Sequence, residues 1–112
     1  MNIKTLIAIT LICFGLSAAA EDRIISVAYE VALSDFRAPA TAHGGASFKP
    51  CGECDRIIVR VTPATRYSIN NKTVRLEDFR KAVRQADERD TKGLVVLHHL
   101  ESDTIKSISA SI

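Results

Sequence analysis

The sequence predicts an α+β domain in which one helix covers a mostly antiparallel sheet of about five strands, in the order β-loop-ββ-α-ββ. Two observations predict this class. Several short runs alternate apolar and polar residues, which is typical of strands half buried against a core. The run from residue 76 to residue 86 instead repeats its apolar residues every three or four positions, as an amphipathic helix does.

The first strand is predicted over residues 24–33, because apolar side chains occupy every second position there. Those side chains are Ile25, Val27, Tyr29, Val31 and Leu33. Residues 34–55 are rich in Pro, Gly, Ala and Ser and include the glycine pair Gly44–Gly45, so we expect a long loop. A loop of this length is unusual in a small domain and indicates a functional or mobile segment.

The second strand is predicted over residues 56–61, with Ile57, Val59 and Val61 facing inward. Pro63 favours a turn within residues 62–65, after which the chain is expected to return as a strand over residues 66–69. The residues Asn-Asn-Lys at 70–72 predict another turn before Val74.

A helix is predicted next, with an apolar stripe formed by Leu76, Phe79, Val83 and Ala86. Glu77 and Asp78 suit its positive N-terminal end, and Gly93 suits its exit. Two final strands, over residues 94–100 and 104–112, are expected to form a hairpin around residues 101–103.

Residues 1–20 have the composition of a Sec-type signal peptide. Lys4 precedes an apolar run over residues 5–16, and Ala18 and Ala20 form a small-residue cleavage motif. We expect cleavage after Ala20, which gives a periplasmic or secreted chain, residues 21–112, that folds as a single small α+β domain without stable membrane insertion. Lipidation at Cys13 and a retained N-terminal anchor are the alternatives, and the bulky residue before Cys13 disfavours lipidation.

The charge pattern argues against nucleic acid as a partner. The sequence has 15 Lys and Arg, of which Lys4 leaves with the signal, so 14 remain against 13 Asp and Glu. These charges are interspersed, whereas a nucleic-acid site needs a basic stripe or patch.

Cys51 and Cys54 are the two cysteines of the mature chain, and an oxidising compartment favours a disulfide between them. A reactive C-x-x-C pair needs a lowered thiol pKa, which a helix N-terminus supplies in thioredoxin-like proteins. Here a strand is predicted to follow the motif, and Glu53 and Asp55 place negative charge beside the thiols. A structural disulfide is therefore the first interpretation, and thiol–disulfide exchange is the alternative.

A metal site is the third interpretation of the cysteines. Two of the three histidines, His43, His98 and His99, would complete a two-Cys, two-His set. Because adjacent residues of a strand point to opposite faces, His98 and His99 are poorly placed to share one ion. We therefore predict no metal and no cofactor, with these histidines as weak candidates.

Residues 57–98 resemble the periplasmic domain of the ExbD/TolR family. The resemblance lies in "IIVRVTPATRYSINNKTVRLEDFRKAV" and in the later "GLVVLHH". It implies a strand–hairpin–helix–strand core and a role as an accessory in envelope transport. No functional residue is carried over, because the membrane helix of that family bears an Asp and the apolar run of residues 5–16 has no acid.

The sequence contains no hydrolase or phosphate-loop motif, so we expect a non-enzymatic binding domain, with oxidoreductase as the one enzyme class considered. The expected contact surfaces are the loop over residues 34–55 and an exposed sheet edge. The expected partner is another envelope protein or a small ligand. A thiol–disulfide or metal-handling protein and an ExbD/TolR-like accessory are the alternatives.

Overall fold

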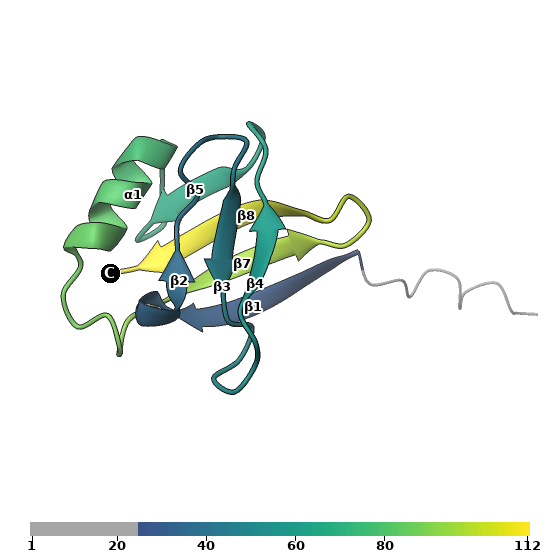
Figure 1. Ribbon diagram of the computed structural model, residues 1–112. Helices are drawn as coiled ribbons and strands as arrows, with labels where there is room; N and C mark the ends of the chain where they lie inside the picture. The colour runs from purple at the N-terminus through teal and green to yellow at the C-terminus, as the bar shows by residue number, and fades with distance from the viewer. Residues whose placement is uncertain (1–24) are drawn as a thin grey trace, which may run out of the picture.

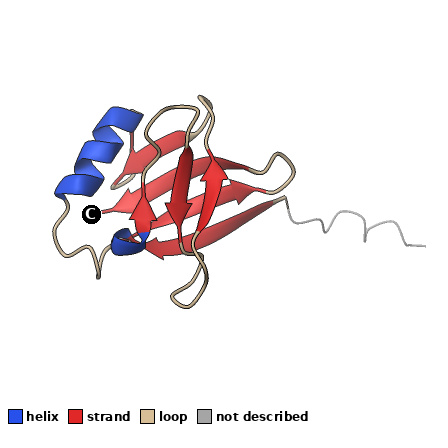
Figure 2. Ribbon diagram, viewed as in Figure 1, coloured by secondary structure: helices blue, strands red, loops and turns tan. Residues whose placement is uncertain are grey.

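The computed structural model describes residues 25–112, so the signal peptide predicted over residues 1–20 and its processing lie outside the described residues. The described chain contains eight strands, one α-helix and a short 3-10 helix (Figures 1 and 2). In chain order these are β1 Ser26–Ala32, the 3-10 helix η2 Leu33–Asp35, β2 Phe36–Arg37, β3 Gly45–Phe48, β4 Ile57–Arg60, β5 Arg66–Ile69, β6 Lys72–Val74, α1 Leu76–Gln85, β7 Gly93–His99 and β8 Thr104–Ser111.

The eight strands form one mixed sheet with β8 at its centre. β8 pairs antiparallel with β7, which pairs in turn with β1. On its other side β8 runs parallel to β4 and to β5. β3 and β2 extend the sheet from β4, and β6 extends it from β5. In Figure 1, β2, β3 and β4 lie across the long strands β1, β7 and β8, so the sheet folds over itself into two layers.

The hydrophobic core lies between these two layers and between the layers and α1. The ring of Tyr29 on β1 lies 5.7 Å from that of Phe48 on β3, which joins the two layers. Phe79 of α1 is fully buried, and its ring lies 6.2 Å from Phe36 and 5.2 Å from Tyr67. The helix therefore closes one end of the two-layered sheet (Figure 2).

The predicted mostly antiparallel sheet of about five strands is wrong, and one reason is the predicted loop over residues 34–55. This segment contains β2 and β3, and its apolar residues Phe36, Ala46 and Phe48 are buried. Each of the two strands has only two to four residues, and small side chains alternate with the buried ones in β3. Such short runs give too few repeats for a period of two to be recognised.

The second reason is the chain direction after Pro63. The predicted turn does form, with the Thr65 N–H donating to the Thr62 carbonyl at 3.0 Å. However, the buried Thr65 hydroxyl donates to the Ile105 carbonyl of β8 at 2.6 Å. The chain therefore continues alongside β8 instead of reversing, and β4 and β5 both pair with β8 in parallel.

The predicted helix is confirmed in place and orientation, since Phe79 and Val83 are buried. Its exit at Gly93 is wrong. The helix ends at Gln85, because Ala86 has extended backbone angles (φ −68°, ψ 136°) and Glu88 has a positive φ of 53°. Gly93 instead begins β7, where an added Cβ would lie 3.0 Å from the Val31 carbonyl oxygen.

The predicted turn before Val74 is also confirmed. Asn70 and Asn71 have positive φ values of 50° and 72°, which suits a two-residue hairpin turn between β5 and β6. The Asn70 side chain pairs with the backbone of Ile112, accepting from its N–H at 2.9 Å and donating to its carbonyl at 3.2 Å. This turn therefore holds the end of β8.

Candidate functional site

The cysteine pair lies in a turn between β3 and β4. A disulfide joins Cys51 and Cys54, whose Cα atoms are 5.0 Å apart, and the Cys54 N–H donates to the Cys51 carbonyl at 3.2 Å. The segment after the motif leads into β4, so no helix begins at the motif in the part of the chain that the structure describes. The disulfide therefore closes the turn that precedes β4, and it lacks the helix dipole that activates thiols in redox motifs.

Within residues 25–112, no three or more His, Cys, Asp or Glu side chains lie close enough together to hold a metal ion. His98 faces the inner side of the sheet, where its ring lies 6.3 Å from Tyr29, and its side chain is only 12% exposed. His99 is the next residue on β7 and contacts different partners. His43 lies in the loop before β3.

The turn of the β7–β8 hairpin, residues 100–103, is held by the two histidines that precede it. His98 Nε2 lies 2.8 Å from Asp103 Oδ1, and His99 Nδ1 lies 2.8 Å from the Ser102 hydroxyl. The Ser102 N–H also donates to His99 Nδ1 at 3.3 Å, so this ring nitrogen is the acceptor. Because the carboxylate pairs with His98 rather than His99, the histidine beside Ser102 lacks the acid of a Ser-His-Asp relay.

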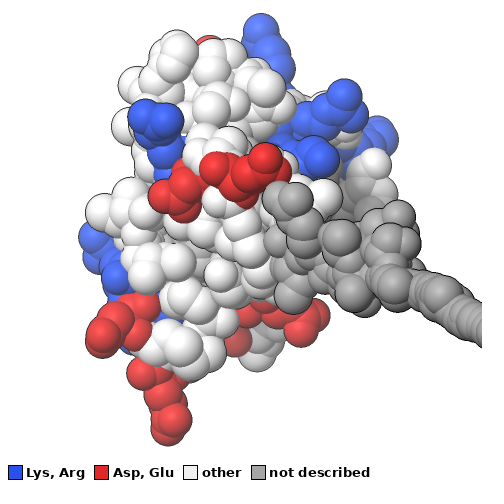
Figure 3. All heavy atoms as spheres, turned by 90° about the vertical axis from the view of Figure 1, so that its right-hand side faces the viewer, with Lys and Arg blue, Asp and Glu red and all other residues white. Residues whose placement is uncertain are grey.

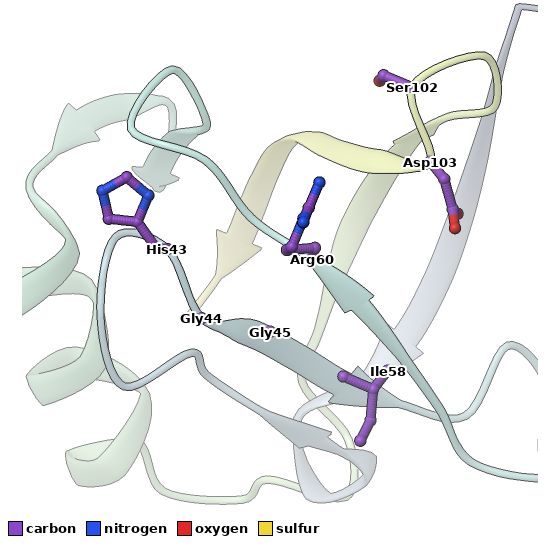
Figure 4. Close-up of a pocket in the computed structure, with 7 residues that line it drawn as sticks. All are labelled: His43, Gly44, Gly45, Ile58, Arg60, Ser102 and Asp103. Carbon is purple, nitrogen blue, oxygen red and sulfur yellow. The ribbon is translucent and has the colours of Figure 1, made fainter.

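His43 and the hairpin meet at a cavity of about 580 Å³, which we call the Arg60 cavity. Its lining residues are His43, Gly44, Gly45, Ile58, Arg60, Ser102 and Asp103. Figure 4 shows the Arg60 side chain between His43 on one side and the hairpin with Ser102 and Asp103 on the other. The volume falls within the range of small-molecule sites.

The register of β3 and β4 explains how this cavity is formed. Gly45 pairs with Arg60, which pairs with Thr104 at the end of the hairpin, so three segments of the chain meet in one row. A Cβ at Gly45 would lie 2.7 Å from Ile58 Cγ2. Any other residue at position 45 would therefore force Ile58, which also lines the cavity, to move.

Arg60 supplies positive charge to the cavity. Within residues 25–112 no Lys or Arg side chain lies within 4.0 Å of a carboxylate, and Asp103 contacts His98, so Arg60 has no carboxylate partner there. Ser102 also lines an adjoining cavity of about 250 Å³, whose wall includes Lys106 and His99. The two adjoining cavities thus present two cationic side chains, Arg60 and Lys106, and two imidazoles, together with the Asp103 carboxylate, and guanidinium, ammonium and imidazole N–H groups bind anions.

The charge of this side of the molecule is mixed. In Figure 3 basic side chains lie in the upper part of the view and at its left edge, and acidic ones form a band above the middle and further groups at the bottom. This distribution fits a local site for an anionic group better than an extended polyanion, which needs a broader basic surface.

Sequence reasoning found part of this site. The sequence indicates His43, His98 and His99 as weak metal candidates and the pair Gly44–Gly45 as part of a loop, but no motif in it indicates Arg60. The glycine pair before a short strand was the available signal. The approach of the hairpin to Arg60 depends on the parallel pairing of β4 with β8, which no local pattern reveals.

Comparisons with known proteins identify no relative: no family model, no curated protein and no solved structure matches the chain.

Proposed function

We propose that the protein is a non-enzymatic binding domain, exported to the periplasm or secreted, that binds a small ligand with a carboxylate or phosphate group in the Arg60 cavity. The observation that carries this proposal is an arginine without an acidic partner in the described chain, at the wall of a cavity of about 580 Å³. A guanidinium is always charged and binds carboxylate and phosphate through paired hydrogen bonds.

The neighbouring groups support an anionic ligand. His43 lines the cavity on one side of Arg60 and offers an imidazole N–H, whereas on the other side the Ser102 hydroxyl already donates its one proton to His99 Nδ1 (Figure 4). His99 orients Ser102 through the 2.8 Å hydrogen bond. The Asp103 carboxylate, which also lines the cavity, pairs with His98. It therefore does not compete with an anionic ligand for Arg60.

The experiment is a titration of the ¹⁵N-labelled protein with citrate and, separately, with inorganic phosphate, at constant ionic strength. We expect amide shifts at Gly44, Gly45, Arg60 and Ser102. Arg60→Gln should weaken binding about tenfold or more, because a hydrogen bond to a charged group contributes roughly 1.5–3 kcal/mol.

Arg56→Gln is the matched control. Arg56 leads into the same strand, but its guanidinium donates to the Ser47 hydroxyl at 3.1 Å and does not line the cavity. Equal weakening by both substitutions would show that the anions respond to general surface charge, and the proposed site would be wrong.

A further inference from the structure

The backbone of β1 has one bonded edge and one open edge. The hydrogen bonds from Leu33 N–H to the Lys92 carbonyl (3.0 Å) and from Leu100 N–H to the Ile25 carbonyl (2.8 Å) join residues that are directly opposite in the β1–β7 register. In an antiparallel pair, such bonded positions alternate with non-bonded ones. The odd-numbered residues of β1 therefore bond to β7, and the even-numbered residues direct their N–H and C=O groups away from it.

The outward-directed residues are Ser26, Ala28, Glu30 and Ala32. Within residues 25–112, β1 pairs with β7 alone, and it stands at the end of the strand order (Figure 1). The other border strands have two residues in β2 and three in β6, whereas β1 has seven. Proteins usually protect such an edge with charged side chains, Pro or a bulge, and β1 has no Lys, Pro or bulge and only one charged side chain, Glu30.

We propose that this edge pairs with the same edge of a second copy of the chain, antiparallel and with the two-fold axis at Tyr29. This register places Ala28 opposite Glu30 of the second copy and Ser26 opposite its Ala32. Each of the four outward-directed residues then exchanges an N–H and a C=O bond with its partner, and the two sheets become one.

The sequence of β1 favours this register over the two registers whose axis is shifted by one residue, to Glu30 or to Ala28. Centring the pair on Glu30 would set two carboxylates directly opposite each other, which is destabilising. Centring it on Ala28 would leave Ala32 beyond the partner's β1. The Tyr29 register uses the whole strand and sets the two Tyr29 rings opposite each other, on the face where Tyr29 is partly exposed beside Phe48.

Self-complementarity is the reason to infer a second copy rather than an unrelated peptide. The side chains on the outer face of β1 are small at Ser26, Ala28 and Ala32, so they admit their own counterparts without collision. The one charged side chain, Glu30, faces Ala28 of the second copy. An isologous two-fold contact requires this kind of match of a surface with itself.

The test is sedimentation equilibrium of the exported protein over a wide concentration range, with the variants Ala28→Pro and Ala28→Thr. Proline at position 28 removes an outward N–H and leaves the bonds to β7 untouched. It should weaken dimerisation roughly thirtyfold or more, since two hydrogen bonds are lost per dimer, one from each chain. Threonine keeps the N–H and should leave the dimer intact.

Amide hydrogen exchange of the unmodified chain gives a second readout that does not depend on the folding of a variant. The amides of Ala28 and Glu30 should gain protection as the chain concentration rises, while those of Val27 and Tyr29 are protected throughout by β7. A chain that stays monomeric with freely exchanging Ala28 and Glu30 amides overturns the proposal. A dimer that tolerates Ala28→Pro, or an edge protected only by another protein, also overturns it.

Discussion

Phe79 of α1 is the side chain whose removal tests the fold most directly. It is fully buried and is the one helix side chain whose ring contacts aromatic rings from two different strands, Phe36 of β2 and Tyr67 of β5. Phe79→Ala therefore empties the junction between the helix and the sheet.

The expected cost follows from the size of the group removed. Truncation of a buried Phe to Ala costs about 3–5 kcal/mol, from lost transfer free energy and the cavity left behind. At roughly 0.05–0.15 kcal/mol per residue, a domain of this length has a free energy of unfolding of about 4–13 kcal/mol. The substitution should remove a large part of this stability and lower the melting temperature by about 12 °C or more.

The assay is urea unfolding followed by far-UV circular dichroism, because the chain contains no Trp. Phe79→Leu retains most of the volume and should cost less than about 1.5 kcal/mol, so it reports on the site even if the Ala variant does not fold. Arg84→Ala, at an exposed position of the same helix, is the control and should change stability by no more than about 0.5 kcal/mol. If Phe79→Ala shifts the midpoint no more than Arg84→Ala does, the packing described for α1 is wrong.

Three further predictions concern Tyr67, the disulfide and the signal. Burial raises the pKa of the Tyr67 phenol, whose buried hydroxyl lacks a hydrogen-bond partner among the described residues. The folded state thus holds this proton more tightly than the unfolded state does, so stability should fall as the pH rises above the unfolded pKa of about 10. Tyr67→Phe should reduce this loss of stability at alkaline pH. In thermal unfolding at neutral pH, the same substitution should stabilise the protein by about 1 kcal/mol. Reducing the bond between Cys51 and Cys54 should lower stability by no more than about 2 kcal/mol with unchanged circular dichroism, because so short a ring restricts the unfolded chain little, and a larger loss would contradict this view. Intact mass of the exported protein should correspond to a chain that begins at Glu21, and a mass with an acyl group on Cys13 would refute this processing.

The amino-acid sequence by itself determined the local elements of the fold. The apolar residues of β1 alternate and those of α1 recur at helical spacing, because burying one face imposes a period on neighbouring residues. β4 and β7 are short apolar runs beside turn residues, which also indicates strands. The asparagine turn before β6 could be recognised for a similar local reason, since Asn tolerates positive φ.

The tertiary structure decided which strands are neighbours and in which direction they run. Phe36 and Phe48 are buried because β2 and β3 fold over the long strands, yet their runs are too short to display a period. The turn at Pro63 has the same local bonds whether the next strand reverses or continues. The hydrogen bond from Thr65 to Ile105, far along the chain, accompanies the parallel course.

The candidate site, like the order of the strands, was decided by the tertiary structure and not by local sequence. His43, Arg60 and Ser102 come from three separate segments, and each is an ordinary polar residue in its own stretch of sequence. They line one cavity because β4 pairs with both β3 and β8. Periodicity arises from interactions between near neighbours and can be read along the chain, whereas a site of this kind exists only once the pairing of distant strands has been chosen.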